Sequence, residues 1–212
     1  MTARWTTVWL RLHDFVLKSL PKRRAVVATD ATGFSGRKRP SREVDHGMKA
    51  TQDWVKTHAA FEADSFIVLS YEWTGSKVHE SQMFKSVWDR VPSNVTPKRS
   101  LADSAYFSEK CLAVAKQHGV TPFHVVKKNA RHFKKPVTLY EKMVSFWQHW
   151  PNRAAELYGK RNRAETAFSM IGGQFDHRIR CRTENGRENV VRGKIAAHNI
   201  RMLDWLSFKS AN

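Results

Sequence analysis

Short apolar runs typical of β-strands fill the first part of the sequence, and helical periodicity fills the rest. The runs at 25–34, 54–63 and 65–73 are rich in branched and aromatic residues and are bounded by turn residues, which is the pattern of strands. Shorter strand-type segments follow at 99–106 and 121–126. Strands that come first, with helices interleaved and then following, predict a mixed α/β fold in which helices flank one central sheet.

Helices are indicated by apolar residues that recur at spacings of three and four. We expect Gly172 and Gly173 to end the helix that begins near residue 153, because glycine is a poor helix former. In the last helix, we expect Ile200 to lie on the buried face. The spacing predicts helices over 1–20, 80–91, 108–118, 138–150, 153–170 and 188–208. The C-terminal part of the chain is therefore helical.

The charge of the chain restricts the class of partner. Lys and Arg outnumber Asp and Glu by 37 to 19, a formal net charge of +18, and such a chain prefers polyanions. No segment reaches the ~20 apolar residues of a membrane-spanning helix. Only two cysteines are present, with no CxxC pair, so a disulfide framework or a structural zinc site is not expected. These features favour nucleic acid over a membrane, in a reducing cytoplasmic compartment.

Basic residues also occur in clusters with aromatic residues between them. Any one cluster is compatible with an ordinary solvated face, but four of them favour a nucleic-acid surface. The second cluster reads as an exposed loop, and we expect its Arg37, Lys38 and Arg39 to contact DNA. The clusters lie at 21–24, 37–42, 127–135 and 178–182.

Three carboxylates stand out by their positions. Asp30 and Asp103 each lie near the end of a strand-type run, and Glu165 lies within a predicted helix. Two strand-end carboxylates can face each other if their strands are neighbours, and a helix packed across that edge can supply the third. Such a group suits Mg²⁺, which favours one or two carboxylates together with water and phosphate oxygens. Each residue alone is more often an ordinary surface acid.

The helix that contains Glu165 carries two further candidates. Tyr158, Arg161 and Glu165 are spaced so that they share one helix face. An Arg and a Tyr beside a carboxylate suit a phosphate group, because Arg pairs with phosphate oxygens and Tyr donates a hydrogen bond. A plain surface ion pair between Arg161 and Glu165 explains the same spacing equally well.

Taken together, these motifs closely resemble the catalytic core of DDE insertion-sequence transposases. The resemblance rests on V-A-T-D-A-T-G-F around Asp30, L-A-D-S-A-Y around Asp103 and Y-x-x-R-x-x-x-E ending at Glu165. The order of the three acids and their separations along the chain match the family as well. The segments V-H-E-S at 78–81 and K-I-A-A-H-N-I-R-M-L at 194–203 extend the resemblance over most of the chain.

The resemblance implies a ribonuclease-H-like fold and a metal-dependent transposase. In this family the three acids, here Asp30, Asp103 and Glu165, bind two divalent ions, Mg²⁺ or Mn²⁺. Such enzymes cut transposon ends by hydrolysis and then use the freed 3′ hydroxyl to attack target DNA. The resemblance places Tyr158 and Arg161 on the phosphate backbone of double-stranded DNA. It also implies a homodimer on DNA, associated with the nucleoid.

Two departures from the family pattern leave alternatives open. The family has a Lys seven positions after the Glu, where this chain has Gly172. Lys160, Arg163 and Arg178 are the cations that can compensate, and we expect Lys160 to contact DNA. The segment before Asp30 is short for the family, so we expect residues 1–24 to be a helical remnant of a larger N-terminal region and 25–212 to be the catalytic domain. The main alternative is a truncated, catalytically inactive remnant that binds DNA. A stand-alone metal-dependent nuclease is a third.

Overall fold

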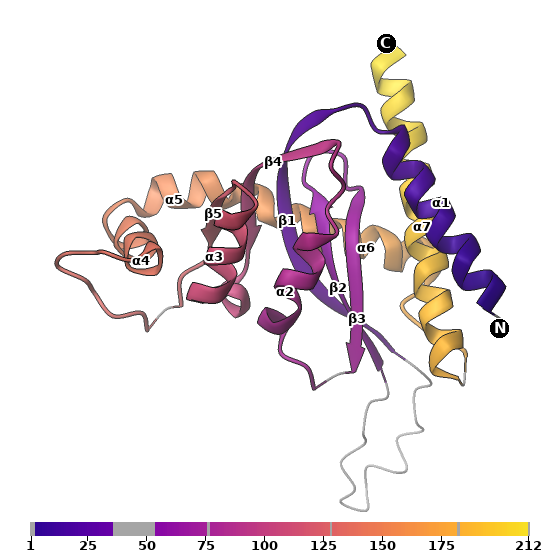
Figure 1. The fold of residues 1–212 in the computed structure, drawn as a ribbon, viewed down its shortest axis with the longest axis horizontal. Helices are drawn as coiled ribbons and strands as arrows, with labels where there is room; N and C mark the ends of the chain where they lie inside the picture. Colours follow the sequence, from indigo (N-terminus) through magenta and orange to yellow (C-terminus); the bar gives the residue numbers. More distant parts are fainter. Residues whose placement is uncertain (1–2, 36–53, 76, 128, 182, 212) are drawn as a thin grey trace, which may run out of the picture.

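A mixed five-stranded sheet forms the centre of the fold, with the strand order β3-β2-β1-β4-β5 (Figure 1). The computed structural model describes residues 3–35, 54–75, 77–127, 129–181 and 183–211. The strands are β1 (Arg23–Ser35), β2 (Trp54–Glu62), β3 (Val68–Gly75), β4 (Val95–Ala102) and β5 (Thr121–His124).

The pairing of the strands follows from the connections between them. Strands β1, β2 and β3 pair antiparallel, and a short turn joins β2 to β3. Strands β1, β4 and β5 pair parallel, which requires crossover connections. The helices α2 (Glu80–Asp89) and α3 (Glu109–Gln117) provide them. This mixed α/β arrangement is ribonuclease-H-like, so the fold predicted from the sequence is confirmed.

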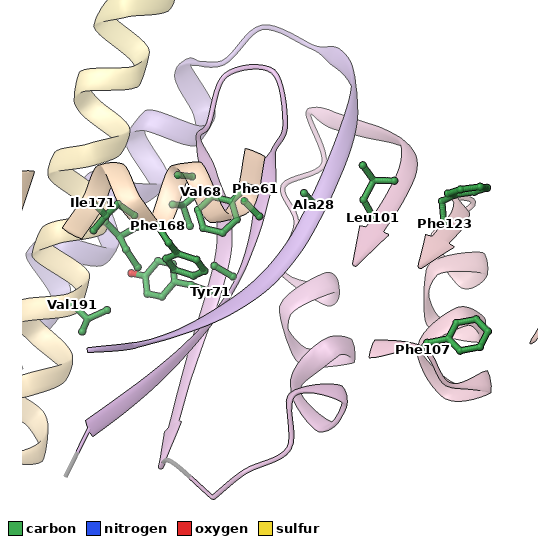
Figure 2. Close-up of a cluster of buried hydrophobic side chains, with 14 of the residues drawn as sticks. Ala28, Phe61, Val68, Tyr71, Leu101, Phe107, Phe123, Phe168, Ile171 and Val191 are labelled. Atoms are coloured by element: carbon green, nitrogen blue, oxygen red, sulfur yellow. The ribbon is translucent and has the colours of Figure 1, made fainter. Parts of the chain in front are cut away.

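Helices cover both faces of the sheet and create two apolar clusters. On one face α2 and α3 pack over the sheet, and the fully buried side chain of Trp88 from α2 lies in this cluster with Val27 of β1. On the other face lies α6 (Asn162–Phe175), whose Phe168 meets Phe61 of β2 edge to face, with ring centroids 4.7 Å apart (Figure 2). Both faces of the sheet are therefore buried, each beneath its own cluster of apolar side chains.

Beyond β5, two short helices lead back toward the sheet. Helix α4 (Leu139–His149) begins at a capping box, and α5 (Pro151–Tyr158) begins with a proline, which suits a first helical turn. The short 3₁₀ helix η3 (Gly159–Arg161) then connects α5 to α6. The single helix predicted over 153–170 is therefore wrong. The 3₁₀ turn interrupts the α-helix, and its last residue, Arg161, reaches Asp30 on β1.

The two glycines predicted to end α6 lie inside it. The helix continues to Phe175 and ends at Asp176, which has a positive φ of 62°. Gly172 is buried, and a Cβ atom built on it would lie 1.8 Å from Nε2 of His177. The missing side chain therefore admits the His177 ring, and the expectation that Gly172 and Gly173 shorten the helix is wrong.

The N-terminal helix α1 (Ala3–Ser19) and the long C-terminal helix α7 (Glu184–Ala211) lie side by side (Figure 1). A hydrogen bond of 3.0 Å joins Thr6 of α1 to Asn189 of α7. Ile200, expected on the buried face of α7, is 43% exposed. None of the described helices combines the length and the apolar character needed to cross a membrane. The division of the chain at residue 24 stays a prediction.

Candidate active site

Asp30 and Asp103 lie beside each other where two parallel strands meet. In the ladder between β1 and β4, Thr29 pairs with Ala102, so the next position on each strand places Asp30 next to Asp103. The sequence predicted both carboxylates at strand ends but contained no register. Asp103 does follow the end of β4, whereas Asp30 lies inside β1, where it still pairs with Ala59 of β2. The parallel pairing of β1 with β4 is what brings them together, although they lie far apart in the sequence.

The local structure around Asp103 differs from the expected strand over 99–106. Strand β4 ends at Ala102, directly before Asp103, and the chain then forms the short 3₁₀ helix η2 (Ser104–Tyr106). Asp103 is the N-cap of this turn, and its Oδ1 accepts a hydrogen bond from the backbone N–H of Ala105 at 2.9 Å. The cap fixes Oδ1 and leaves Oδ2 available to Arg161.

One guanidinium group connects all three predicted carboxylates. Arg161, at the end of η3, places its Nη2 3.2 Å from Oδ1 of Asp30 and 3.6 Å from Oδ2 of Asp103. Its Nη1 donates to Oε1 of Glu165, which lies one turn further along in α6. The structure thus gathers Asp30, Asp103 and Glu165 around one cation, and we call these three residues the carboxylate triad. Their catalytic and metal-binding roles stay predictions.

The triad is buried at one end and open at the other. The side chains of Asp30 and Arg161 are 12% and 11% exposed, whereas that of Glu165 is 56% exposed. Three carboxylates and one guanidinium leave two formal negative charges without a counter-charge within the group. Solvent and ligands reach the triad from the side of Glu165.

Burial dominates the electrostatics of Asp30. It raises the pKa of this carboxyl to about 6, because transfer out of water disfavours the charged form. The Arg161 guanidinium and the backbone N–H of Ala31 lower the pKa, and the charges of Asp103 and Glu80 raise it again. Asp30 therefore lies in a site with an excess of negative charge, where an added cation is favourable.

The donor set of the triad fits a hard divalent cation, since carboxylate oxygens are the ligands that Mg²⁺ and Mn²⁺ prefer. Within the described part of the chain, no three His, Cys, Asp or Glu side chains are already grouped around a metal position. The cation that the triad shares here is the guanidinium of Arg161. Ion binding at these oxygens therefore requires Arg161 to give way.

Tyr158 and Lys160, predicted to contact DNA, lie in different surroundings. Burial is the main reason why the pKa of the Tyr158 hydroxyl is raised to about 12. The Arg161 guanidinium opposes this shift and the charges of Asp103 and Asp30 add to it, so the hydroxyl is close to the triad. The Nζ of Lys160 instead forms an ion pair of 2.6 Å with Asp64, in the turn after β2. Lys160 is thus directed away from the triad, whereas Tyr158, Arg161 and Glu165, predicted to share one face, lie close together.

The basic loop predicted to contact DNA lies outside the described residues. This segment contains Arg37, Lys38 and Arg39, which follow Asp30 closely in the sequence. Their role as DNA contacts stays a prediction.

Two residues near the triad were missed as site residues from the sequence. Glu80, at the start of α2, pairs with Lys56 at 2.9 Å and contributes to the raised pKa of Asp30. The fully buried hydroxyl of Tyr106 has no hydrogen-bond partner among the described residues. Burial raises its pKa, and the charges of Glu80, Asp30 and Asp103 add to this effect. The signal was present, because both residues belong to the family-like segments at 78–81 and around Asp103.

A basic groove was also not apparent from the sequence. It has a volume of about 430 Å³ and lies where β4 and β5 meet α4 and α5. Lys98, Arg99 and Lys142 line it together with Thr121 and several apolar side chains, and none of the described residues that line it is acidic. Arg99 donates to the backbone oxygen of Leu157 at 3.5 Å, which ties the groove to the end of α5. Lys98 and Arg99 come from β4 and Lys142 comes from α4, so no single cluster in the sequence marks the groove.

Comparisons with known proteins identify the family of the chain. Residues 21–200 match the family Transposase DDE domain, and this range includes the whole triad. No curated protein matches the chain. Among solved structures, the chain is similar to "Mos1 transposase paired-end complex with left transposon end", at 12% identity and a TM-score of 0.29, over 96% of this chain and 62% of that one. The chain thus spans less than two thirds of that transposase. By the family match, the chain belongs to the transposase DDE domain family.

Proposed function

We propose that this chain is the catalytic domain of a DNA transposase, which cuts phosphodiester bonds at transposon ends and joins them to target DNA. The observation that carries the proposal is the convergence of the triad. Three carboxylates from β1, the end of β4 and α6 meet around one guanidinium, although they are widely separated in the sequence. A structural ion pair needs one acid for each base, and this site has three.

In this proposal each residue of the site has a distinct task. Asp30, Asp103 and Glu165 would hold two divalent ions, which would supply activation of the attacking hydroxyl or water and stabilisation of the leaving oxygen. Tyr158, whose hydroxyl lies close to the triad, donates a hydrogen bond to the phosphate of the bond being cut. Arg161 pairs with phosphate oxygens once it has left the carboxylates.

The distribution of positive charge supports DNA as the substrate. The chain carries a formal charge of +18, and the groove of Lys98, Arg99 and Lys142 contributes three cations. Arg99 lies on β4 four positions before Asp103, which corresponds to ~13 Å of strand. A DNA backbone held at the triad therefore reaches the groove within a few nucleotides, where its phosphates find unopposed positive charge.

Alanine substitutions of the triad test the proposed reaction. In the presence of Mg²⁺ or Mn²⁺, Asp30→Ala, Asp103→Ala and Glu165→Ala should each lower cleavage and joining of DNA that carries the element's ends by about 10³-fold or more. The reason is that a lost metal ligand removes several kcal/mol of transition-state stabilisation. Product mapping on sequencing gels measures both steps and separates a transposase from a nuclease that only cuts.

A matched control removes an acid of the same region that does not touch the triad. Glu156 on α5 is exposed and pairs with Arg153. Glu156→Ala should retain the activity of the unchanged chain. Full activity in any of the three triad variants, with the protein folded, would falsify the assignment of the catalytic residues.

The second candidate function is a catalytically inactive DNA-binding remnant. Gly172 favours it, because a glycine stands where the family has a DNA-contacting lysine, and the buried side of this residue is filled by His177. The remnant would bind DNA with strong salt dependence and produce no cleaved product with either ion. The same cleavage assay on the unchanged chain decides between the two functions.

A further inference from the structure

The contacts of Arg161 are confined to one end of its side chain. Both Nη atoms are directed at the triad, where they meet oxygens of Asp30, Asp103 and Glu165. The Nε is buried and has no hydrogen-bond partner among the described residues. A buried donor without a partner is uncommon in a purely structural ion pair and calls for an explanation. The position of Arg161 is therefore set by the negative charge of the triad and not by a complete hydrogen-bonding network.

The backbone around Arg161 is suited to a change of position. Arg161 ends η3, a three-residue 3₁₀ turn, and neither η3 nor the following α6 begins with a side-chain cap. No atom lies within 4 Å of a Cβ built on Gly159, the first residue of this turn. The exposed carboxylate of Glu165 marks the solvent side of the site. The guanidinium can therefore leave toward solvent without displacing the core.

We propose that Arg161 is an internal counter-cation of the triad, which competes with divalent ions for the same carboxylates and becomes available to a DNA phosphate when ions take its place. This inference rests on the proposed function, because it assumes that ions and DNA meet at the triad. The physical reason is that a guanidinium and a divalent ion repel each other and cannot both occupy one set of oxygens. Ion binding and phosphate binding are then coupled, and the coupling is reciprocal.

Titration calorimetry with Mn²⁺ tests the competition without any measurement of activity. Arg161→Met removes the cation and keeps an unbranched side chain. It should bind Mn²⁺ more tightly than the unchanged chain by about 5- to 150-fold, the usual range of coupling between two sites. Arg153→Met, on exposed α5, removes the same charge away from the triad and should leave the Mn²⁺ affinity unchanged. Equal affinities in the unchanged chain and in Arg161→Met would overturn the proposal.

Thermal unfolding provides an independent measurement. Without ions, Arg161→Met leaves three carboxylates with no counter-cation, so its unfolding temperature should fall in chelator and recover when Mn²⁺ is added. The rise on adding Mn²⁺ should exceed that of the unchanged chain. Arg161→Lys, which offers a smaller cation with fewer donors, should lie between the two and serves as the test if Arg161→Met does not fold. The same rise in all three proteins contradicts the counter-cation role.

DNA binding tests the second half of the inference. Fluorescence anisotropy with a short duplex should show that Ca²⁺ increases the affinity of the unchanged chain and of Arg153→Met. This increase should be smaller in Arg161→Met, which has no guanidinium to release. An equal increase in all three proteins contradicts the release of Arg161.

If neither the unchanged chain nor Arg161→Met binds Mn²⁺, the proposed function fails; if both bind it equally, only the role of Arg161 fails.

Discussion

At the scale of single residues, His124 shows how the core depends on neutral polar groups. His124 is the last residue of β5 and its ring is fully buried. Its Nδ1 donates to the backbone oxygen of Tyr106 at 3.2 Å. The other nitrogen, Nε2, then accepts from the Ser100 hydroxyl at 3.0 Å. Burial lowers the pKa of His124 to about 4, because the charged ring would lose its hydration. The neutral form is therefore the native one.

The lowered pKa of His124 predicts acid destabilisation. The unfolded chain takes up a proton near pH 6.5 and the folded chain only near pH 4, so the unfolded state binds more protons between these values. Stability should be full above about pH 6.5 and fall as the pH drops toward 4, by roughly 3 kcal/mol for this residue. Chemical denaturation between pH 7 and pH 4 measures the loss. In His124→Gln, the free energy of unfolding should depend on pH with about one proton fewer. An unchanged pH dependence would show that His124 does not cause the acid destabilisation.

At the scale of elements, α6 shows how a poor helix former can be retained inside a helix. Gly172 costs helical stability through its backbone entropy but leaves room for the His177 ring, which lies 6.0 Å from the Phe34 ring. The backbone oxygen of His177 also accepts from the N–H of Ser35, so the segment after α6 is fixed to the end of β1. The helix that carries Glu165 is thereby held at the strand that carries Asp30.

Two neighbouring glycines provide a matched test of this packing. Nothing lies within 4 Å of a Cβ built on Gly173, so Gly173→Ala should raise the free energy of unfolding by about 0.5–1 kcal/mol through helix propensity. Gly172→Ala should gain less or destabilise the protein, because the His177 ring must leave its place. In a His177→Ala background the two substitutions should become equal. Equal effects in the unchanged background, measured by urea denaturation, would contradict the packing argument.

At the scale of the whole molecule, the groove and the triad are neighbouring sites of opposite charge. Strand β4 connects the two sites. It carries Lys98 and Arg99 of the groove, and it is followed directly by Asp103 of the triad. Lys98 and Lys142 form no ion pair among the described residues, so neither is neutralised within that part of the chain. Such cations bind phosphates and release condensed counterions from DNA.

Neutralising the groove should therefore weaken DNA binding in a salt-dependent way. The double variant Lys98→Gln and Lys142→Gln should reduce the slope of log affinity against log salt by about 2, close to one for each lost phosphate contact. The pair Lys110→Gln and Lys116→Gln on α3 lies outside the groove and is a control with the same loss of charge. Anisotropy titrations from low to high salt measure both slopes. Equal salt slopes for the two double variants would show that the groove does not contact DNA.

Local patterns determined most of the elements and the identity of the three acids. The strand that contains Asp30, the strand that leads to Asp103 and the helix cap at Ser108 depend on neighbouring residues only, and the structure contains each of them. Local pattern also predicted a helix around Glu165, but not the 3₁₀ turn that precedes α6. Family resemblance, not periodicity, linked the three acids into one candidate site before their positions were known.

Only the tertiary structure decided how the side chains of distant segments meet. Arg161 and Asp30 are 131 residues apart in sequence, and their contact exists because β1, β4 and α6 pack together. Asn199 is buried, unlike its neighbour Ile200, because its side chain bonds the backbone of Val68 on β3. The sequence by itself thus determined a basic mixed α/β chain with three candidate acids. The pairing of Arg161 with Glu165 follows from their local spacing. Packing alone brought the same guanidinium to Asp30 and Asp103, since those contacts depend on three-dimensional proximity and leave no mark in local spacing.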